Sequence, residues 1–205
     1  MLPGPTIIIS CPHCGQYAKE KTLFSGNTFG ATLWSDGKRI APMLPDFPSL
    51  VLCKKCDQFY WVKDVKEIQE VNSYKELEEK WMNVDFVEFP TFHQYFKSLE
   101  TISDEKSIRI KIWWSFNDYL RNNNENDITP DMQIMNTENL IVLLTLLDET
   151  NDSDLLMKAE VLCNLGRFED SRQLLGKIKD PSLIKIKEKF LAEINKENIQ
   201  VFRLY

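Results

Sequence analysis

Two short stretches decide how the N-terminal third of this chain folds: Cys11-Pro12-His13-Cys14-Gly15 and Cys53-Lys54-Lys55-Cys56. Each places two cysteines three positions apart, and 38 residues, from 15 to 52, lie between the two stretches. A tight turn of this kind presents two sulfur atoms to one ion, and two such turns complete the tetrahedral shell that Zn²⁺ prefers. The spacing therefore predicts one structural zinc ion held by four thiolates, those of Cys11, Cys14, Cys53 and Cys56.

The charge of the chain is unevenly distributed. The whole sequence carries a formal net charge of −6, made up of +3 in residues 1–66 and −9 in residues 67–205. A step of this kind indicates two modules with different surfaces. The acidic second part argues against a protein that wraps nucleic acid, because neutralising phosphates requires clustered cations.

The sequence shows no pattern that would direct the chain into or across a membrane. Its start lacks the basic and apolar regions of a signal peptide. The longest apolar stretch, Leu140–Leu147, is much shorter than the roughly 20 residues that span a bilayer. We therefore expect a cytoplasmic protein without a membrane partner. Thiols stay reduced in that compartment, so paired cysteines are better interpreted as metal ligands than as disulfides.

Both cysteine turns adjoin segments with strand character. Thr6–Ser10 is β-branched and apolar, and Gln58–Lys63 contains three adjacent aromatic residues. With Cys-Pro-His-Cys-Gly as a first knuckle and Cys-Lys-Lys-Cys as a second, residues 6–63 resemble a rubredoxin-like zinc ribbon. The resemblance implies a small β-rich metal-binding domain, which we assign to residues 1–66.

The first cysteine pair also permits a redox interpretation. Cys-Pro-His-Cys is the active-site sequence of strongly oxidising thioredoxin-fold enzymes, in which a helix N-terminus lowers the pKa of the first thiol. That chemistry needs a long helix beginning at the first cysteine. Here Gly15 and the breaker string 25–30 (Ser-Gly-Asn-Thr-Phe-Gly) oppose one. A thiol–disulfide redox protein using Cys11 and Cys14 is therefore an alternative that the sequence favours less.

A β-hairpin is predicted between the two knuckles. Asp36-Gly37 is the preferred pair for a two-residue type I′ turn, and that register places Trp34 opposite Arg39, where ring and guanidinium could stack. The candidate interaction surface formed by this hairpin comprises Trp34, Lys38 and Arg39. An ordinary exposed cross-strand pair is the simpler interpretation of the same residues.

Helical spacing dominates residues 67–205. Four helices are predicted from caps and apolar stripes, at residues 74–82 behind Ser73, 90–99 from Pro90, 105–121 behind Ser103-Asp104, and 138–147 behind Asn136 or Thr137. We assign this range to a second, all-α domain.

Residues 152–183 resemble one tetratricopeptide repeat. Ala159 matches the small residue of the first helix, Gly166-Arg167-Phe168 matches the turn and its aromatic residue, and Ser171 stands where the second helix usually has alanine. The resemblance implies a packed helical hairpin of the kind that binds other proteins. Only one repeat is matched, and about three are needed for a free-standing solenoid, so we expect a tetratricopeptide-like hairpin rather than a repeat array.

These features predict an α+β fold in which a zinc ribbon is followed by a helical module. The predicted function is that of a zinc-binding, non-catalytic interaction or scaffold protein whose partner is another protein. The sequence contains no recognisable nucleophile–base pair and no phosphate-binding loop, which favours a protein that is not an enzyme.

A nucleic-acid-associated zinc ribbon is the alternative. It would use aromatic residues of the first domain and its cations Lys38, Arg39, Lys54, Lys55 and Lys63. Its net charge of +3 is lower than a phosphate-binding surface normally carries.

Overall fold

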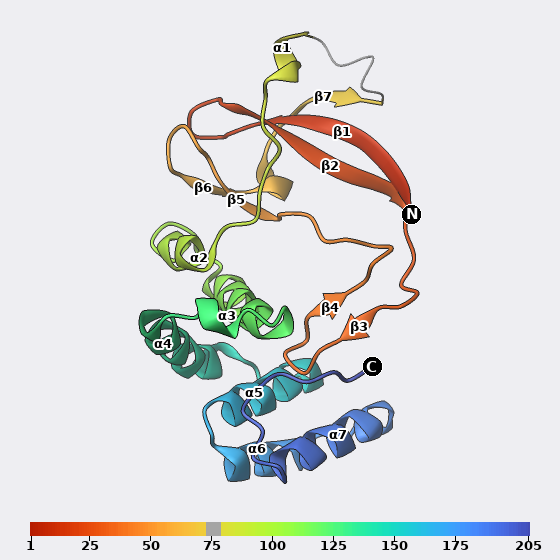
Figure 1. Ribbon diagram of the computed structural model, residues 1–205, viewed down its shortest axis with the longest axis vertical. Coiled ribbons are helices and arrows are strands. Elements are labelled where there is room, and N and C mark those ends of the chain that lie inside the picture. Colours follow the sequence, from red (N-terminus) through yellow and green to blue (C-terminus); the bar gives the residue numbers. More distant parts are fainter. Residues whose placement is uncertain (73–78) are drawn as a thin grey trace. The chain divides into compact units, whose positions relative to one another are not determined.

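The computed structural model describes residues 1–72 and 79–205. These residues form two compact units: unit 1 consists of Met1–Gly30 with Ile40–Ser103, and unit 2 consists of Ala31–Arg39 with Asp104–Tyr205. The predicted α+β fold is confirmed, since small antiparallel sheets precede the helices α1–α7 (Figure 1). The helix predicted at 74–82 lies partly outside the described residues, which include only its last turn, α1 (Glu79–Met82).

The main sheet of unit 1 has three antiparallel strands in the order β2–β1–β7. They are β1 (Leu2–Ser10), β2 (Tyr17–Ser25) and β7 (Glu67–Val71). The strand predicted at 6–10 is confirmed as part of β1, where Ile7, Ile8 and Ile9 are all buried. Helical spacing was expected from residue 67, whereas Glu67–Val71 is a strand. Pairing with β1 overrides its weak local propensity, because it satisfies the main-chain groups of a buried central strand.

A second ladder of unit 1 carries the other cysteine pair. Strand β5 (Leu50–Leu52) pairs antiparallel with β6 (Phe59–Trp61), with Val51 opposite Tyr60. Strand β6 confirms the strand predicted within 58–63, and a short 3-10 helix, η1 (Val62–Asp64), follows it. The buried cluster here is small and includes two cysteines; its members are Ile7, Ile9, Cys11, Val51, Cys53, Tyr60 and Val62.

The helix predicted from Pro90 begins slightly later than expected. Thr91 is its N-cap: the Thr91 hydroxyl accepts from the Gln94 N–H, and the Gln94 side chain accepts from the Thr91 N–H. This capping box starts α2 (Phe92–Ser98), which buries Phe92 and Tyr95.

Unit 2 contains five helices among the described residues. They are α3 (Glu105–Arg121), α4 (Pro130–Leu146), α5 (Asp152–Asn164), α6 (Phe168–Leu175) and α7 (Ile184–Ile194). Short 3-10 helices, η3 (Glu125–Asp127) and η4 (Pro181–Leu183), precede α4 and α7. Helix α3 confirms the prediction for 105–121, and its Trp113 is fully buried against α4 and α5 residues. Figure 1 shows α5, α6 and α7 as neighbouring helices.

The helix predicted at 138–147 is longer than expected. It begins at Pro130 with Thr129 as its N-cap, so Asn136 and Thr137 lie in its interior and the predicted cap is wrong. Asparagine is uncommon in helix interiors, because its side-chain amide competes with the helix for the hydrogen bonds of neighbouring main-chain groups. Buried Asn139 instead has a tertiary partner: its amide donates to the Arg109 carbonyl oxygen at 3.0 Å.

Helices α5 and α6 form the hairpin expected at residues 152–183. Gly166, at φ +71°, ends α5, and the Arg167 N–H donates to the Leu162 carbonyl oxygen at 2.8 Å. Ala159 and Ser171 are both fully buried at the crossing, where the Ser171 hydroxyl donates to the Ala159 carbonyl oxygen at 2.8 Å.

The hairpin between the knuckles has a different turn from the predicted one. Its strands are β3 (Thr32–Leu33) and β4 (Arg39–Ile40). The Gly37 N–H donates to the Trp34 carbonyl oxygen, and the Trp34 N–H donates to the Lys38 carbonyl oxygen, both at 2.9 Å. Trp34 is therefore opposite Lys38 rather than Arg39. Only Gly37 within the turn has a positive φ, of +79°. The type I′ prediction is wrong because the loop has three residues and a bulge.

The tip of this hairpin belongs to unit 2 and is buried there. Asp36 is fully buried, and its carboxylate accepts from Asn117 at 2.8 Å and from the Arg121 guanidinium. The Trp114 indole N–H donates to the Asp36 carbonyl oxygen at 2.9 Å. The C-terminal segment completes the arrangement, since the Ser35 N–H donates to the Phe202 carbonyl oxygen at 2.9 Å. A segment that lies between the knuckles in sequence thus forms part of the helical unit.

A second buried carboxyl group lies close to this tip. Glu160 of α5 is fully buried, and its Oε1 accepts from the Asn164 amide at 3.1 Å. Its Oε2 has no hydrogen-bond partner among the described residues. Burial, followed by the charge of Asp36, raises the pKa of Glu160 to about 8. This carboxyl group is therefore mainly protonated at neutral pH.

Candidate metal centre

The first knuckle turns the chain from β1 into β2. The Cys11 N–H donates to the Gln16 carbonyl oxygen at 2.8 Å, and the Gly15 N–H donates back to the Cys11 carbonyl oxygen at 2.9 Å. Gly15 has φ +72°, a conformation that glycine adopts without strain. A glycine directly after the second cysteine therefore lets the main chain fold back at this knuckle.

The second knuckle repeats the same hydrogen bonds without a glycine. The Cys53 N–H donates to the Gln58 carbonyl oxygen at 3.0 Å, and the Asp57 N–H donates to the Cys53 carbonyl oxygen at 2.9 Å. Asp57, at φ +53°, takes the place that Gly15 has in the first knuckle. Sequence reasoning missed this residue. The available signal was that aspartate is among the few residues that tolerate the left-handed region.

The four sulfur atoms of the predicted ligands converge. The Cys11 and Cys56 sulfurs are 3.8 Å apart, the Cys14 and Cys53 sulfurs are 3.6 Å apart, and all four lie within 4.8 Å of one another. A regular tetrahedron with Zn–S bonds of about 2.3 Å has edges of about 3.8 Å. None of the four cysteines forms a disulfide. The donor set therefore fits one tetrahedral metal ion.

The clustered thiols of Cys11, Cys53 and Cys56 differ in how readily they ionise. Burial raises the pKa of the Cys11 thiol. Burial acts in the same direction on Cys53, but N–H groups of Cys56 and Lys55 and the neighbouring sulfurs lower its pKa to about 7. Burial and the adjacent sulfurs raise the pKa of Cys56 to about 12. One thiolate forms readily, and a divalent metal ion would supply the positive charge that further ionisation needs.

Two other residues with ligand-type side chains, His13 and Cys163, are not part of the four-cysteine cluster. His13, in the first knuckle, is exposed, and its Nε2 is 3.3 Å from the Phe59 carbonyl oxygen. Cys163 belongs to unit 2, where its buried sulfur is 3.3 Å from the Ser171 hydroxyl oxygen. Burial raises the pKa of the Cys163 thiol to about 11, as expected for an unreactive core thiol.

The residues of the predicted interaction surface do not stack on one another. The half-buried Trp34 ring has the guanidinium carbons of Arg121 and Arg203 at 5.1 and 5.4 Å from its centroid, so these residues replace the predicted Arg39. Lys38 forms an ion pair with Asp118 at 2.5 Å, and Arg39 is exposed.

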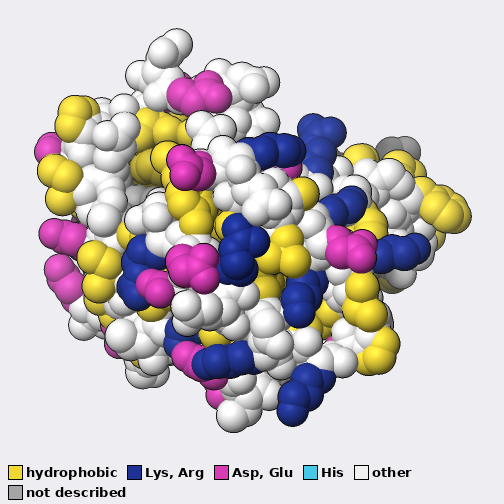
Figure 2. All heavy atoms as spheres, turned by 90° about the horizontal axis from the view of Figure 1, so that it is seen from below, with side chains coloured by type: hydrophobic (Ala, Val, Ile, Leu, Met, Phe, Trp, Pro, Cys, Tyr) yellow, Lys and Arg dark blue, Asp and Glu magenta, His cyan; other side chains and the backbone are white. Residues whose placement is uncertain are grey.

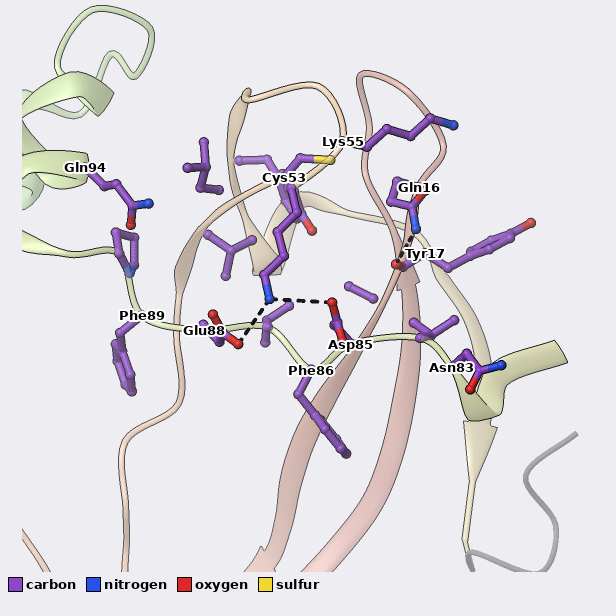
Figure 3. Close-up of a pocket in the computed structure, with 18 residues that line it drawn as sticks. Gln16, Tyr17, Cys53, Lys55, Asn83, Asp85, Phe86, Glu88, Phe89 and Gln94 are labelled. Atoms are coloured by element: carbon purple, nitrogen blue, oxygen red, sulfur yellow. Dashed lines mark hydrogen bonds and ion pairs between the residues drawn. The ribbon is translucent and has the colours of Figure 1, made fainter. Parts of the chain in front are cut away.

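A pocket of 360 Å³ lies beside the second knuckle, within unit 1. Its wall includes residues 51–55 and the segment 83–90. The Lys54 ammonium is 3.1 Å from a Glu88 carboxylate oxygen and 3.5 Å from an Asp85 one (dashed lines in Figure 3). The Lys54, Asp85 and Glu88 side chains are 58 %, 73 % and 69 % exposed, so water screens these pairs and they contribute little stability.

The cations proposed for nucleic-acid binding are partly neutralised, since Lys38 and Lys54 both have acidic partners. Tyr60, one of the aromatic residues of that hypothesis, is buried. Figure 2 shows one face of the molecule, on which Lys and Arg side chains are interspersed with Asp and Glu side chains rather than separated by sign.

Two further findings concern the chain as a whole. In the part of the chain that the structure describes, no helix has both the length and the apolar character needed to cross a membrane. Comparisons with protein-family models, curated proteins and solved structures give no match for this chain.

Proposed function

We propose that this chain is a zinc-binding, non-catalytic interaction protein, in which a structural zinc ion stabilises unit 1 so that it can hold another protein. The observation that carries the proposal is the convergence of four cysteine sulfurs within 4.8 Å. Four protein thiolates fill a tetrahedral shell and leave no position for a substrate, unlike catalytic zinc sites, which keep one open. The two knuckles are then those of a zinc-ribbon-like domain.

A bound zinc ion would reinforce the buried cluster around the two knuckles. Cys11 and Cys53 are themselves part of the small buried cluster of unit 1, so a bound zinc would cross-link β1–β2 to β5–β6 through that cluster. The binding free energy of structural zinc is folding free energy, because the unfolded chain has no preformed site. The role proposed for zinc is therefore architectural.

The redox alternative has less support. The turn after Cys11 leads into strand β2, not into the helix that lowers a thiol pKa in thioredoxin-fold enzymes. The nucleic-acid alternative has less support as well, because Lys38 and Lys54 are engaged with carboxylates. We therefore propose that the partner is another protein. It would bind to unit 1 or to the tetratricopeptide-like hairpin α5–α6.

Metal analysis of the purified full chain tests the zinc site. We expect about one zinc per chain in the wild type and none in Cys53→Ser, while Cys163→Ala, which removes a cysteine outside the site, keeps its zinc. Chelation should abolish hydrogen-exchange protection at Val51 and Tyr60, which are opposite each other in the β5–β6 ladder. A metal-free wild type with a reactive Cys11 thiol would refute the proposal in favour of redox chemistry.

The binding role needs its own measurement. Fluorescent single- and double-stranded oligonucleotides titrated at 50 and 200 mM salt distinguish the two kinds of partner. Tight binding that weakens steeply with salt would refute the protein-partner proposal in favour of nucleic acid. We expect weak binding with little salt dependence.

A further inference from the structure

We propose that residues 199–205, called here the C-terminal arm, exchange between two copies of this chain, so that each arm fills the site of the other copy. The partner inferred for this surface is therefore a second copy of the same chain. The inference goes beyond the proposed function, because the arm and its site both lie in unit 2 and involve none of the four clustered cysteines.

The C-terminal arm returns from the end of α7 to the hairpin that carries β3 and pairs with residues 33–35 (Figure 1). The Leu204 N–H donates to the Leu33 carbonyl oxygen at 2.8 Å, and the Ser35 N–H donates to the Phe202 carbonyl oxygen at 2.9 Å. The Phe202 N–H donates in turn to the Ser35 hydroxyl oxygen at 3.0 Å. The arm is thus held by hydrogen bonds from its main chain, as in recognition by strand addition.

Side chains of the C-terminal arm fill a site that other parts of unit 2 build. Leu204 is 3 % exposed and belongs to the buried cluster of α5, α6 and α7. The Phe202 ring packs edge-on against the fully buried Phe190 ring of α7, with centroids 5.1 Å apart. The Asn164 amide of α5 donates to the Ile199 carbonyl oxygen at 3.0 Å. This site is incomplete without an arm, and an arm of identical sequence from a second copy completes it equally well.

A short hinge, residues 196–198, connects α7 to the arm and has a strained main chain. Glu197 is exposed and has φ +54°, in the left-handed region that residues other than glycine avoid. The main-chain N–H groups of the hinge all donate to the carbonyl oxygens of Glu193 and Ile194, at the end of α7. An open hinge can continue α7 instead, which keeps such hydrogen bonds and relieves the strain. Short hinges under strain favour exchange of the segment that follows them.

The balance between a closed monomer and an exchanged dimer depends on protein concentration and on the hinge. A short linker holds its arm at an effective concentration of about 1 mM, which an arm from another copy has to match. Both hinges open in the exchanged dimer, so the strain is relieved twice, which favours the dimer by about thirtyfold. We therefore expect a dissociation constant of about 30 µM for the dimer.

Sedimentation equilibrium of the full chain, from about 1 to about 300 µM, measures this constant. Glu197→Gly removes the strain of the closed hinge and should weaken the dimer about thirtyfold. Glu197→Ala is the matched control, because it removes the same side chain and keeps the strain. Its dissociation constant should stay within about threefold of the wild-type value. Circular dichroism reports whether each variant folds.

A disulfide trap tests whether the arm itself is exchanged. Trp34 and Arg203 form an antiparallel bridge. Hydrogen bonds between their neighbours flank this bridge, a pairing in which Cα atoms are about 4.5 Å apart and a disulfide can form. Trp34→Cys and Arg203→Cys are prepared as separate full-length variants, mixed at high concentration and oxidised. We expect a disulfide-linked dimer that forms in the mixture and not in either variant alone.

Three results would overturn the inference. The first is a wild type that stays monomeric up to about 300 µM. The second is a dimer whose dissociation constant is the same in Glu197→Gly and Glu197→Ala. The third is a dimer whose folded cysteine variants do not cross-link when mixed, which would assign association to another surface. Zinc content is measured in the same samples, so failure of arm exchange is distinguishable from failure of the zinc proposal.

Discussion

Replacing Glu160 by glutamine should stabilise the protein, and the gain should grow with pH. The Glu160 side chain is fully buried, and burial together with the Asp36 charge raises its pKa from 4.5 to about 8. The folded chain therefore keeps a proton on this carboxyl group across a pH range in which the unfolded chain releases it. Because the folded state binds more protons than the unfolded state, this group makes stability fall as pH rises from about 4.5 to about 8.

The size of the effect follows from the two pKa values. The raised pKa of Glu160 lowers the free energy of unfolding by almost nothing near pH 4.5, by about 3 kcal/mol at pH 7, and by between 4 and 5 kcal/mol above pH 8. Each pKa unit corresponds to about 1.36 kcal/mol. Glutamine has nearly the same shape, keeps an oxygen for the Asn164 amide, and is neutral at every pH, as the protonated carboxyl group is. Glu160→Gln should therefore gain about 3 kcal/mol at pH 7.

Urea unfolding followed by tryptophan fluorescence at pH 5, 6, 7 and 8 measures this gain as the difference between variant and wild type. Taking the difference removes the pH dependence that both proteins share, including that of metal binding. Glu188→Gln, a change at an exposed position of α7, is the control and should leave the profile unchanged. A difference that does not vary with pH, or a variant less stable than the wild type at pH 8, would refute the reasoning.

Two further changes test other parts of the structure. Asp36→Asn removes the fully buried one of the two carboxylates that pair with the Arg121 guanidinium, whose side chain is 2 % exposed, and leaves only the partly exposed Asp118. The change should cost about 3 kcal/mol in urea unfolding, and a loss below about 1 kcal/mol, equal to that of the exposed control Asp46→Asn, would contradict the buried ion pair. Gly15→Ala puts a side chain at φ +72° and should cost about 1–2 kcal/mol, seen as weaker zinc retention against a chelator. Asp57→Gly, at the equivalent position of the other knuckle, should keep or tighten zinc, and equal weakening by both changes would disprove their equivalence.

The four-cysteine cluster could be predicted from sequence because the signal of each cysteine pair is local. Each Cys-x-x-C pair fits within one turn, and Gly15 marks the point at which the chain folds back. The strands around Ile7–Ile9 and Phe59–Trp61 were predictable for the same reason, since β-branched and aromatic residues border the turns. No sequence pattern connects the two cysteine pairs, which are separated by 38 residues. Their association was predicted from the preference of Zn²⁺ for four ligands.

Features that depend on distant partners could not be predicted. Asn136 resembles an N-cap in the sequence, although α4 begins at Pro130 with Thr129 as its N-cap. Sequence alone does not reveal that asparagines are buried inside this helix, where Asn139 donates to the Arg109 carbonyl oxygen. The Asp-Gly pair predicted a tight turn, whereas the hairpin widens to bury Asp36 against Arg121. Strand β7 has few strand-forming residues and is fixed by its pairing with β1. In each case tertiary contacts outweigh local propensity.

The position of the hairpin tip also bears on how the chain folds during synthesis. Unit 1 takes in residues up to Ser103, yet residues 31–39 within that range belong to unit 2. Domains generally fold in the order in which they leave the ribosome, N-terminal part first. The residues that surround Asp36 in the folded protein include Arg121 and Glu160, so Asp36 reaches its final environment only after these have been translated. The nascent N-terminal part therefore reaches its final form only after most of the chain has been synthesised. For the same reason, no single cleavage of the polypeptide separates the two units.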